Sequence, residues 1–146
     1  MNKKLFIFIF SVILALSNGV CFAQVSSKGI MSANPLEVVK NPNSYLNKAI
    51  KMNVVFDKFT TLGLDYDKTK HSGEDYIGFL IQRSDVIDHN VPLSEMKLFL
   101  KRSYAEKFAE LETGDKLEIS GIVFSNALGD PWVDINSIVI KEKVKK

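Results

Sequence analysis

The stretch that decides the fold is MKLFLKRSYAEKFAELETGDKLEISGIVF, residues 96–124, in which two alternating segments enclose a helical one. The first segment alternates apolar and polar residues with a period of two, which predicts a half-buried strand. Its inward-facing residues are Met96, Leu98 and Leu100. Lys97, Phe99 and Lys101 are then turned outward.

The middle of this stretch predicts a helix that begins at a capping box of Ser103 and Glu106 and stops at Gly114. Its apolar side chains recur at helical spacing: Tyr104, Phe108 and Leu111. The end of the stretch alternates again and predicts a strand with Leu117, Ile119, Gly121 and Val123 facing inward. Gly121 within that strand indicates a bulge or a sharp bend.

Three more alternating segments, residues 49–57, 75–83 and 131–141, flank this stretch. The first carries Ile50, Met52, Val54 and Phe56 on one face. The last loses its alternation near Asn136 and Ser137, which predicts a second irregularity. Ahead of them, Asn34-Pro35 and Asn41-Pro42 each place an N-cap residue before a proline, which predicts two short helices, and Asn47 can adopt the left-handed turn that ends the second.

The resulting order, three strands, a helix and two strands, resembles that of OB-fold domains. The resemblance covers residues 45–141, and the phrase TGDKLEISGIV is similar to the fourth strand of many such domains. It implies an all-β class: a five-stranded OB-fold-like Greek-key barrel with one capping helix, preceded here by a short helical segment. The phrase LGDPWVD resembles a family of small exported bacterial proteins, from which no activity is carried over.

The N-terminus has the features of a secretory signal. Lys3 and Lys4 precede the apolar run LFIFIFSVILAL, and Cys21 and Ala23 occupy the minus-three and minus-one positions of a cleavage site after Ala23. We therefore expect a periplasmic or secreted protein with no transmembrane span after cleavage, because the apolar run is short for a membrane helix. A lipoprotein modified at Cys21 is disfavoured, since Asn18 and Val20 do not fit a lipobox.

Removal of residues 1–23 leaves a chain that suits one domain, and it also removes the only cysteine. Disulfides and thiolate metal sites are therefore excluded for the mature protein. We expect a flexible leader at residues 24–33, the OB-fold-like domain at 34–141 and a solvated basic tail at 142–146.

The charge balance argues against a general phosphate binder. The full chain has 19 Lys and Arg against 17 Asp and Glu, and loss of Lys3 and Lys4 makes the mature chain neutral. Without the basic tail the body is acidic, with 13 positive and 16 negative residues at 24–140. Nucleic-acid binding is possible for an OB-fold but is disfavoured by this charge.

The longest polar run, TTLGLDYDKTKHSGED at residues 60–75, joins the first two predicted strands. We expect it to lie at the same rim of the barrel as SNALGDPW, residues 125–132, so that the two loops form the lips of a ligand groove. The candidate lip residues are Asp65, Tyr66, Asp130 and Trp132. The floor would be formed by Lys97 and Phe99, with Tyr76, Leu80 and Lys101 beside them. The alternative is that Trp132 closes the barrel and the loop only covers its end.

Other chemistries have weaker support. Residues 65–69, DYDKT, imitate a phosphatase nucleophile motif, but the chain is too short for the doubly wound sheet that such enzymes need. Asp65, Asp67, Glu74 and Asp75 could hold a cation loosely, although the spacing is not that of an EF-hand. His71 and His89 have no zinc-ligand spacing and are expected on the surface.

We therefore expect no cofactor, no metal and no enzymatic activity. The sequence predicts a non-enzymatic binding or interaction module, whose partner is an unknown small ligand, a glycan or a protein. The alternatives are single-stranded nucleic-acid or oligosaccharide binding, and a structural role in which an edge strand pairs with an envelope protein.

Overall fold

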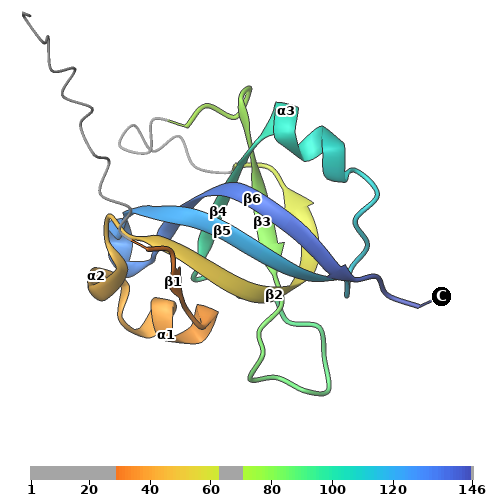
Figure 1. Cartoon of the computed structure of the whole chain (residues 1–146), viewed down its shortest axis with the longest axis horizontal. Coiled ribbons are helices and arrows are strands. Elements are labelled where there is room, and N and C mark those ends of the chain that lie inside the picture. The colour runs from red at the N-terminus through yellow and green to blue at the C-terminus, as the bar shows by residue number, and fades with distance from the viewer. Residues whose placement is uncertain (1–28, 63–70, 146) are drawn as a thin grey trace, which may run out of the picture.

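The computed structural model describes residues 29–62 and 71–145 (Figure 1). The signal sequence predicted at residues 1–23 lies outside the described residues. The helices are α1 (Pro35–Lys40), α2 (Pro42–Tyr45) and α3 (Arg102–Ala105), with 3₁₀ turns at Glu106–Phe108 and Ala127–Gly129. The strands are β1 (Met31–Ser32), β2 (Ala49–Thr60), β3 (Tyr76–Ile81), β4 (Lys97–Lys101), β5 (Lys116–Ser125) and β6 (Trp132–Glu142). Among the described helices, none is long and apolar enough to cross a membrane.

Five of the strands form a closed barrel. They follow one another in the order β2, β3, β4, β6, β5, and β5 pairs with β2 to close the ring. The barrel pairings are antiparallel except for β4 with β6, which is parallel. With α3 between β4 and β5, this arrangement confirms the predicted OB-fold-like barrel.

The barrel interior confirms the period-two patterns. Ile50, Met52, Val54 and Phe56 of β2 are buried in the core cluster, together with Leu98 and Leu100 of β4 and Leu117, Ile119 and Val123 of β5. Each fully buried side chain of this kind contributes about 1.5–3 kcal/mol of hydrophobic free energy. Phe99 and Trp132 are also buried but do not belong to this interior cluster.

Both predicted irregularities lie where β5 and β6 pair. The register passes from Ser120 opposite Ser137 to Gly121 opposite Ile135, which leaves Asn136 as the extra residue of a bulge. A Cβ on Gly121 would lie 2.3 Å from the carbonyl oxygen of Asp134. Glycine is therefore required here by the close approach of the two strands.

The N-terminal helices start as predicted. The side chain of Asn34 caps α1 by accepting a hydrogen bond of 2.9 Å from Leu36 N–H. Asn47, beyond α2, has the left-handed φ of 60° that was expected. Residues 31–32, within the expected leader, pair with β2, so the ordered chain begins before Asn34.

The helix after β4 is shorter than predicted. It starts at Arg102 with Lys101 as its N-cap residue, and no side chain caps it, so the capping box of Ser103 and Glu106 is wrong. One α-helical turn passes into a 3₁₀ turn, and Gly114 ends the connection with a φ of 102°. Tyr104, Phe108 and Leu111 pack against the core cluster. Figure 1 shows α3 at one end of the barrel.

Residues 141–145 of the basic tail are exposed, and two of them also contact the barrel. Lys143 and the main-chain N–H of Val144 both donate hydrogen bonds to the buried carboxylate of Asp115. These two hydrogen bonds attach the tail, up to Val144, to the turn that precedes β5.

Candidate functional site

Two of the candidate groove residues, Asp65 and Tyr66, lie outside the described residues, and they remain predictions. The four others lie together on the outer surface of the barrel. Lys97 and Phe99 are on β4, Trp132 begins β6, and Asp130 precedes it in the β5–β6 turn. The strand register places Lys97 opposite Trp132.

The β5–β6 turn is shaped by two residues with positive φ, Leu128 at 62° and Gly129 at 82°. It directs Asp130 toward β4, where its carboxylate lies 3.5 Å from the Lys97 amine. Lys97 also donates a hydrogen bond to the carbonyl of Ser94. The predicted floor and lip are therefore joined by an ion pair, which fixes the lysine at one end of the site.

Phe99 and Trp132 stack on each other, with ring centroids 5.6 Å apart. Trp132 is 1% exposed and Phe99 is 7% exposed. The indole N–H of Trp132 donates a hydrogen bond of 3.0 Å to the carbonyl of Ala127. The two rings therefore form a rigid wall on the outside of the barrel. They are too buried to be the open stacking surface that the groove hypothesis required, and Trp132 does not close the barrel interior either.

His71 covers this wall from the connection between β2 and β3. Its ring stacks on Phe124 at 4.7 Å and lies 4.1 Å from Tyr76 and 5.0 Å from Phe99. Its Nε2 contacts the carboxylate of Asp134. The expectation of a surface histidine is wrong for His71, because its side chain is only 8% exposed.

The expectation that the two loops share a rim is also wrong. β3 begins at Tyr76 opposite Lys101, the last residue of β4, whereas β6 begins at Trp132 opposite Lys97, the first residue. Because β4 and β6 run parallel, the loops enter from opposite ends of β4. They approach each other across the outer face of the sheet, where His71 reaches Phe99.

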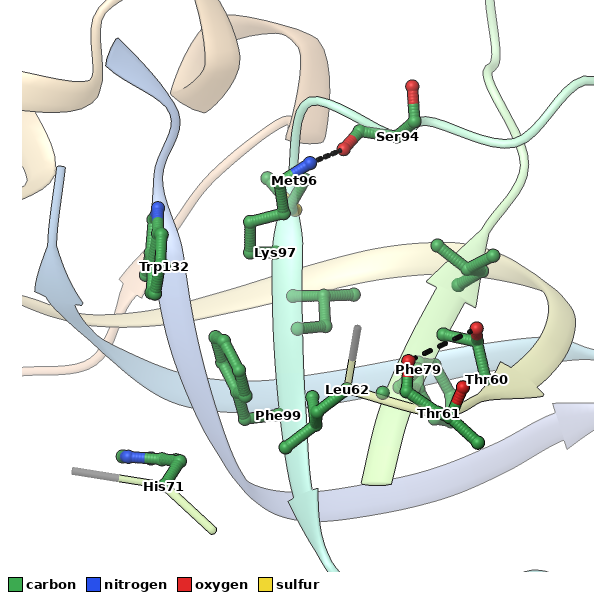
Figure 2. Close-up of a pocket in the computed structure, with 13 residues that line it drawn as sticks. Thr60, Thr61, Leu62, His71, Phe79, Ser94, Met96, Lys97, Phe99 and Trp132 are labelled. Atoms are coloured by element: carbon green, nitrogen blue, oxygen red, sulfur yellow. Dashed lines mark hydrogen bonds between the residues drawn. The ribbon is translucent and has the colours of Figure 1, made fainter. Parts of the chain in front are cut away.

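A pocket of about 240 Å³ lies on this outer face. Figure 2 shows Trp132, Phe99 and His71 on one side of it and residues 60–62 on the other. Leu80 of β3 and Lys97 of β4 also line it, as the groove hypothesis required. Of the other floor residues, Tyr76 contacts His71, and Lys101 is exposed beside a separate hollow that it shares with Tyr76 and Tyr104.

Sequence reasoning missed Phe124, and although it placed residues 60–75 in one lip of the groove, it did not name His71 or residues 60–62 among the candidates. For Phe124 there was a usable signal, since it follows the inward-facing Val123 and is therefore a large aromatic residue at an outward position, as Phe99 is. His71 and residues 60–62 belong to a connection without periodicity, so no pattern of the sequence places them over β4.

The loose cation site stays a prediction, because Asp65 and Asp67 lie outside the described residues. Of its other two members, Asp75 accepts a hydrogen bond of 3.0 Å from the Ser72 hydroxyl, and Glu74 is exposed. Within residues 29–62 and 71–145, no three His, Cys, Asp or Glu side chains gather as metal ligands.

Comparisons with known proteins address the fold. No protein-family model matches the chain, and no curated protein matches it. An aspartyl-tRNA synthetase from Leishmania major Friedlin superposes with a TM-score of 0.52 and 6% identity, over 83% of this chain and 22% of the synthetase. At such low identity the similarity supports the barrel fold alone.

Two further solved structures are similar at lower scores. An asparaginyl-tRNA synthetase from Pyrococcus horikoshii, complexed with asparaginyl-adenylate, gives a TM-score of 0.45 and 15% identity over 69% of this chain and 20% of its own. OBody AM3L09, bound to hen egg-white lysozyme, gives a TM-score of 0.44 and 16% identity. The match covers 69% of this chain and 88% of the OBody chain. The chain spans about a fifth of the length of both synthetases.

Proposed function

We propose that this chain is an exported, non-enzymatic binding module that takes one ring-sized group of its ligand into the pocket on the outer face of β3 and β4. The observation that supports this most directly is the pocket itself, whose aromatic wall is held rigid by the stacking of Phe99 on Trp132 and by the Trp132 hydrogen bond to Ala127. A rigid wall lowers the entropy cost of binding.

The size and lining of the pocket favour a sugar ring. At about 240 Å³ it is smaller than the roughly 300–1,000 Å³ of sites for drug-sized ligands. Leu62 and Leu80 supply apolar contacts, and the Lys97 amine supplies a donor at one end. Because the Asp130 carboxylate compensates this lysine, the pocket offers little attraction to a phosphate, in agreement with the balanced charge of the mature chain.

Amide chemical-shift mapping of the mature protein tests this proposal. We expect chitotetraose to shift the amide signals of Leu62, Leu80 and Lys97, and to do so equally at low and high salt. A short oligothymidylate tests the nucleic-acid alternative, because its binding must weaken steeply as salt rises.

Replacement of Leu80 by tryptophan should fill the pocket and abolish the sugar-induced shifts. The matched control is Ile87→Trp, since Ile87 is 94% exposed on the β3–β4 connection and lies away from the pocket lining. A salt-sensitive response to the oligonucleotide, or sugar-induced shifts that survive in Leu80→Trp, would contradict the proposal.

Export is tested separately. Mass spectrometry of the protein recovered from the periplasm or medium should give a chain that starts at Gln24. An intact Met1, or a lipid on Cys21, would show that this part of the proposal is wrong.

A further inference from the structure

One edge of β2 is shared by two strands that leave a gap between them. β1 pairs with Ile50 and Lys51, and the Lys51 carbonyl accepts a hydrogen bond of 2.9 Å from Ala33 N–H. Farther along the same edge, the Val55 carbonyl accepts one of 2.9 Å from Gln82 N–H, where β3 takes over. Asn53 lies midway between these two contacts.

The main-chain groups of Asn53 face this gap. Alternate residues of a strand turn their N–H and C=O groups toward the same edge, so Asn53 shares the edge used by Lys51 and Val55. Within residues 29–62 and 71–145, the N–H and C=O of Asn53 and the N–H of Val55 have no hydrogen-bond partner. An unpaired strand edge of this kind is a template for another strand.

The gap opens into a cavity of about 500 Å³. One wall is formed by Asn34 and Pro35 at the start of α1, and the other by Arg83 and Val86 of the β3–β4 arm, which we define as residues 83–95. Figure 1 shows α1 and this arm projecting from the same side of the barrel. The Nε2 atom of Gln82, which also lines the cavity, is buried without a hydrogen-bond partner among the described residues.

We propose that this gap is a docking slot for an extended polypeptide segment of a partner protein, which adds to the edge of β2 between β1 and β3. The Asn53 N–H and C=O would bond a carbonyl and an amide of the segment, and the Val55 N–H a further carbonyl. Gln82 Nε2 is the remaining donor. The site is distinct from the pocket on β3 and β4, and the inference does not depend on it.

The spacing of these groups selects a polypeptide. Asn53 and Val55 lie two residues apart, which corresponds to about 6.8 Å along an antiparallel strand. A second strand carries its own amide donors and carbonyl acceptors at that repeat, whereas a phosphate chain carries acceptors only. The free groups run from the Asn53 N–H to the Val55 N–H, between the bonded carbonyls of Lys51 and Val55, so that about three residues of a segment can pair with them.

The charges around the slot are already paired. Arg83 bonds Asp85 at 3.0 Å and also Glu95, Lys116 lies 2.9 Å from Glu142, and Lys141 lies 3.2 Å from Glu118. Net charge of the segment therefore contributes little to recognition. Selectivity comes instead from one apolar side chain that packs on Val86, which is 37% exposed.

The test starts from a phage-displayed library of linear peptides selected on the full mature protein, and the strongest binder is then synthesised. Hydrogen exchange with the peptide at saturation should slow the Asn53 and Val55 amides at least about tenfold, because each gains a hydrogen bond. Protection confined to other amides, or failure of the library to yield a binder, would overturn the proposal.

Asn53→Pro tests the same edge by substitution. Proline removes the N–H and places its ring in the gap, yet costs the barrel no hydrogen bond, because this N–H faces away from β5. We expect affinity for the selected peptide to fall at least about tenfold, while the control Asn53→Ala, which keeps the N–H, stays within about twofold. Equal affinity of a folded Asn53→Pro variant would also overturn the proposal, and if that variant does not fold, the exchange measurement decides.

Discussion

Asp115 anchors the C-terminal tail, and its replacement by asparagine should lower the free energy of unfolding by about 2–3 kcal/mol at neutral pH. The carboxylate is fully buried and accepts three hydrogen bonds, from Glu112 N–H at 2.9 Å, from the Lys143 amine at 2.6 Å and from Val144 N–H at 2.9 Å. Asparagine keeps only one oxygen, so its amide must face one of these donors and leave it unsatisfied.

The loss follows from the chemistry of the three contacts. Hydrogen bonds to a charged acceptor contribute about 1.5–3 kcal/mol each, and an unsatisfied buried donor costs about 1–3 kcal/mol. Because the Lys143 side chain is 47% exposed, water weakens its hydrogen bond to Asp115. The expected loss of unfolding free energy therefore lies at the lower end of the sum of these contributions. For a domain of this length the expected fall in melting temperature is about 8–12 °C.

The effect should depend on pH with a definite sign. Burial raises the pKa of Asp115, but the hydrogen bonds from Glu112, Lys143 and Val144 outweigh it and hold the pKa below its ordinary value. A carboxyl group with a depressed folded-state pKa stabilises the protein above its unfolded pKa of about 3.9. The difference between wild type and Asp115→Asn should therefore be constant above about pH 5 and shrink as the pH falls through the lowered pKa.

Urea denaturation across this pH range measures the difference directly. The matched control is Glu142→Gln, which breaks the ion pair of Lys116 and Glu142, whose side chains are both 58% exposed, and should cost less than about 1 kcal/mol. A loss for Asp115→Asn no larger than that of the control, or one that persists undiminished at acid pH, would refute the reasoning.

Two further substitutions test local features of the fold. Gly121→Ala should destabilise the protein by more than about 2 kcal/mol, because the new Cβ would lie 2.3 Å from the Asp134 carbonyl oxygen, whereas Gly73→Ala, with nothing within 4 Å, should be near neutral in thermal denaturation. Asn34→Ala should cost about 1 kcal/mol, since it removes the side-chain cap of α1. Asn41→Ala should cost less than half of that in the same assay, because Asn41 makes no side-chain cap bond, and equal losses would contradict the capping argument.

The barrel strands could be predicted because a closed interior imposes a period of two. Ile50, Met52 and Val54 alternate with polar residues for this reason, and Gly121 was conspicuous in such a pattern. The start of α3 was harder to predict from the sequence. The helix follows β4 directly, with Lys101 as its N-cap residue, and no capping side chain marks its first turn.

The site was only partly predictable. The alternation of β4 shows that Phe99 faces outward, but it does not show which residue packs on that face. The residue is His71, which comes from a connection without periodicity. The position of the loops depended on the parallel pairing of β4 with β6, which no local pattern encodes. No local pattern marks Asp115 as a buried residue, because its partners in the tail are 28 and 29 positions away.

The parallel pairing of β4 with β6 also determines when the pocket can form. Its aromatic wall needs Trp132, the first residue of the last strand, while its floor is provided by β3 and β4 much earlier in the chain. A nascent chain that ends before β6 leaves β4 with an open side and Phe99 without its stacking neighbour. The pocket proposed here as a ligand site is therefore complete only after β6 has paired with β4.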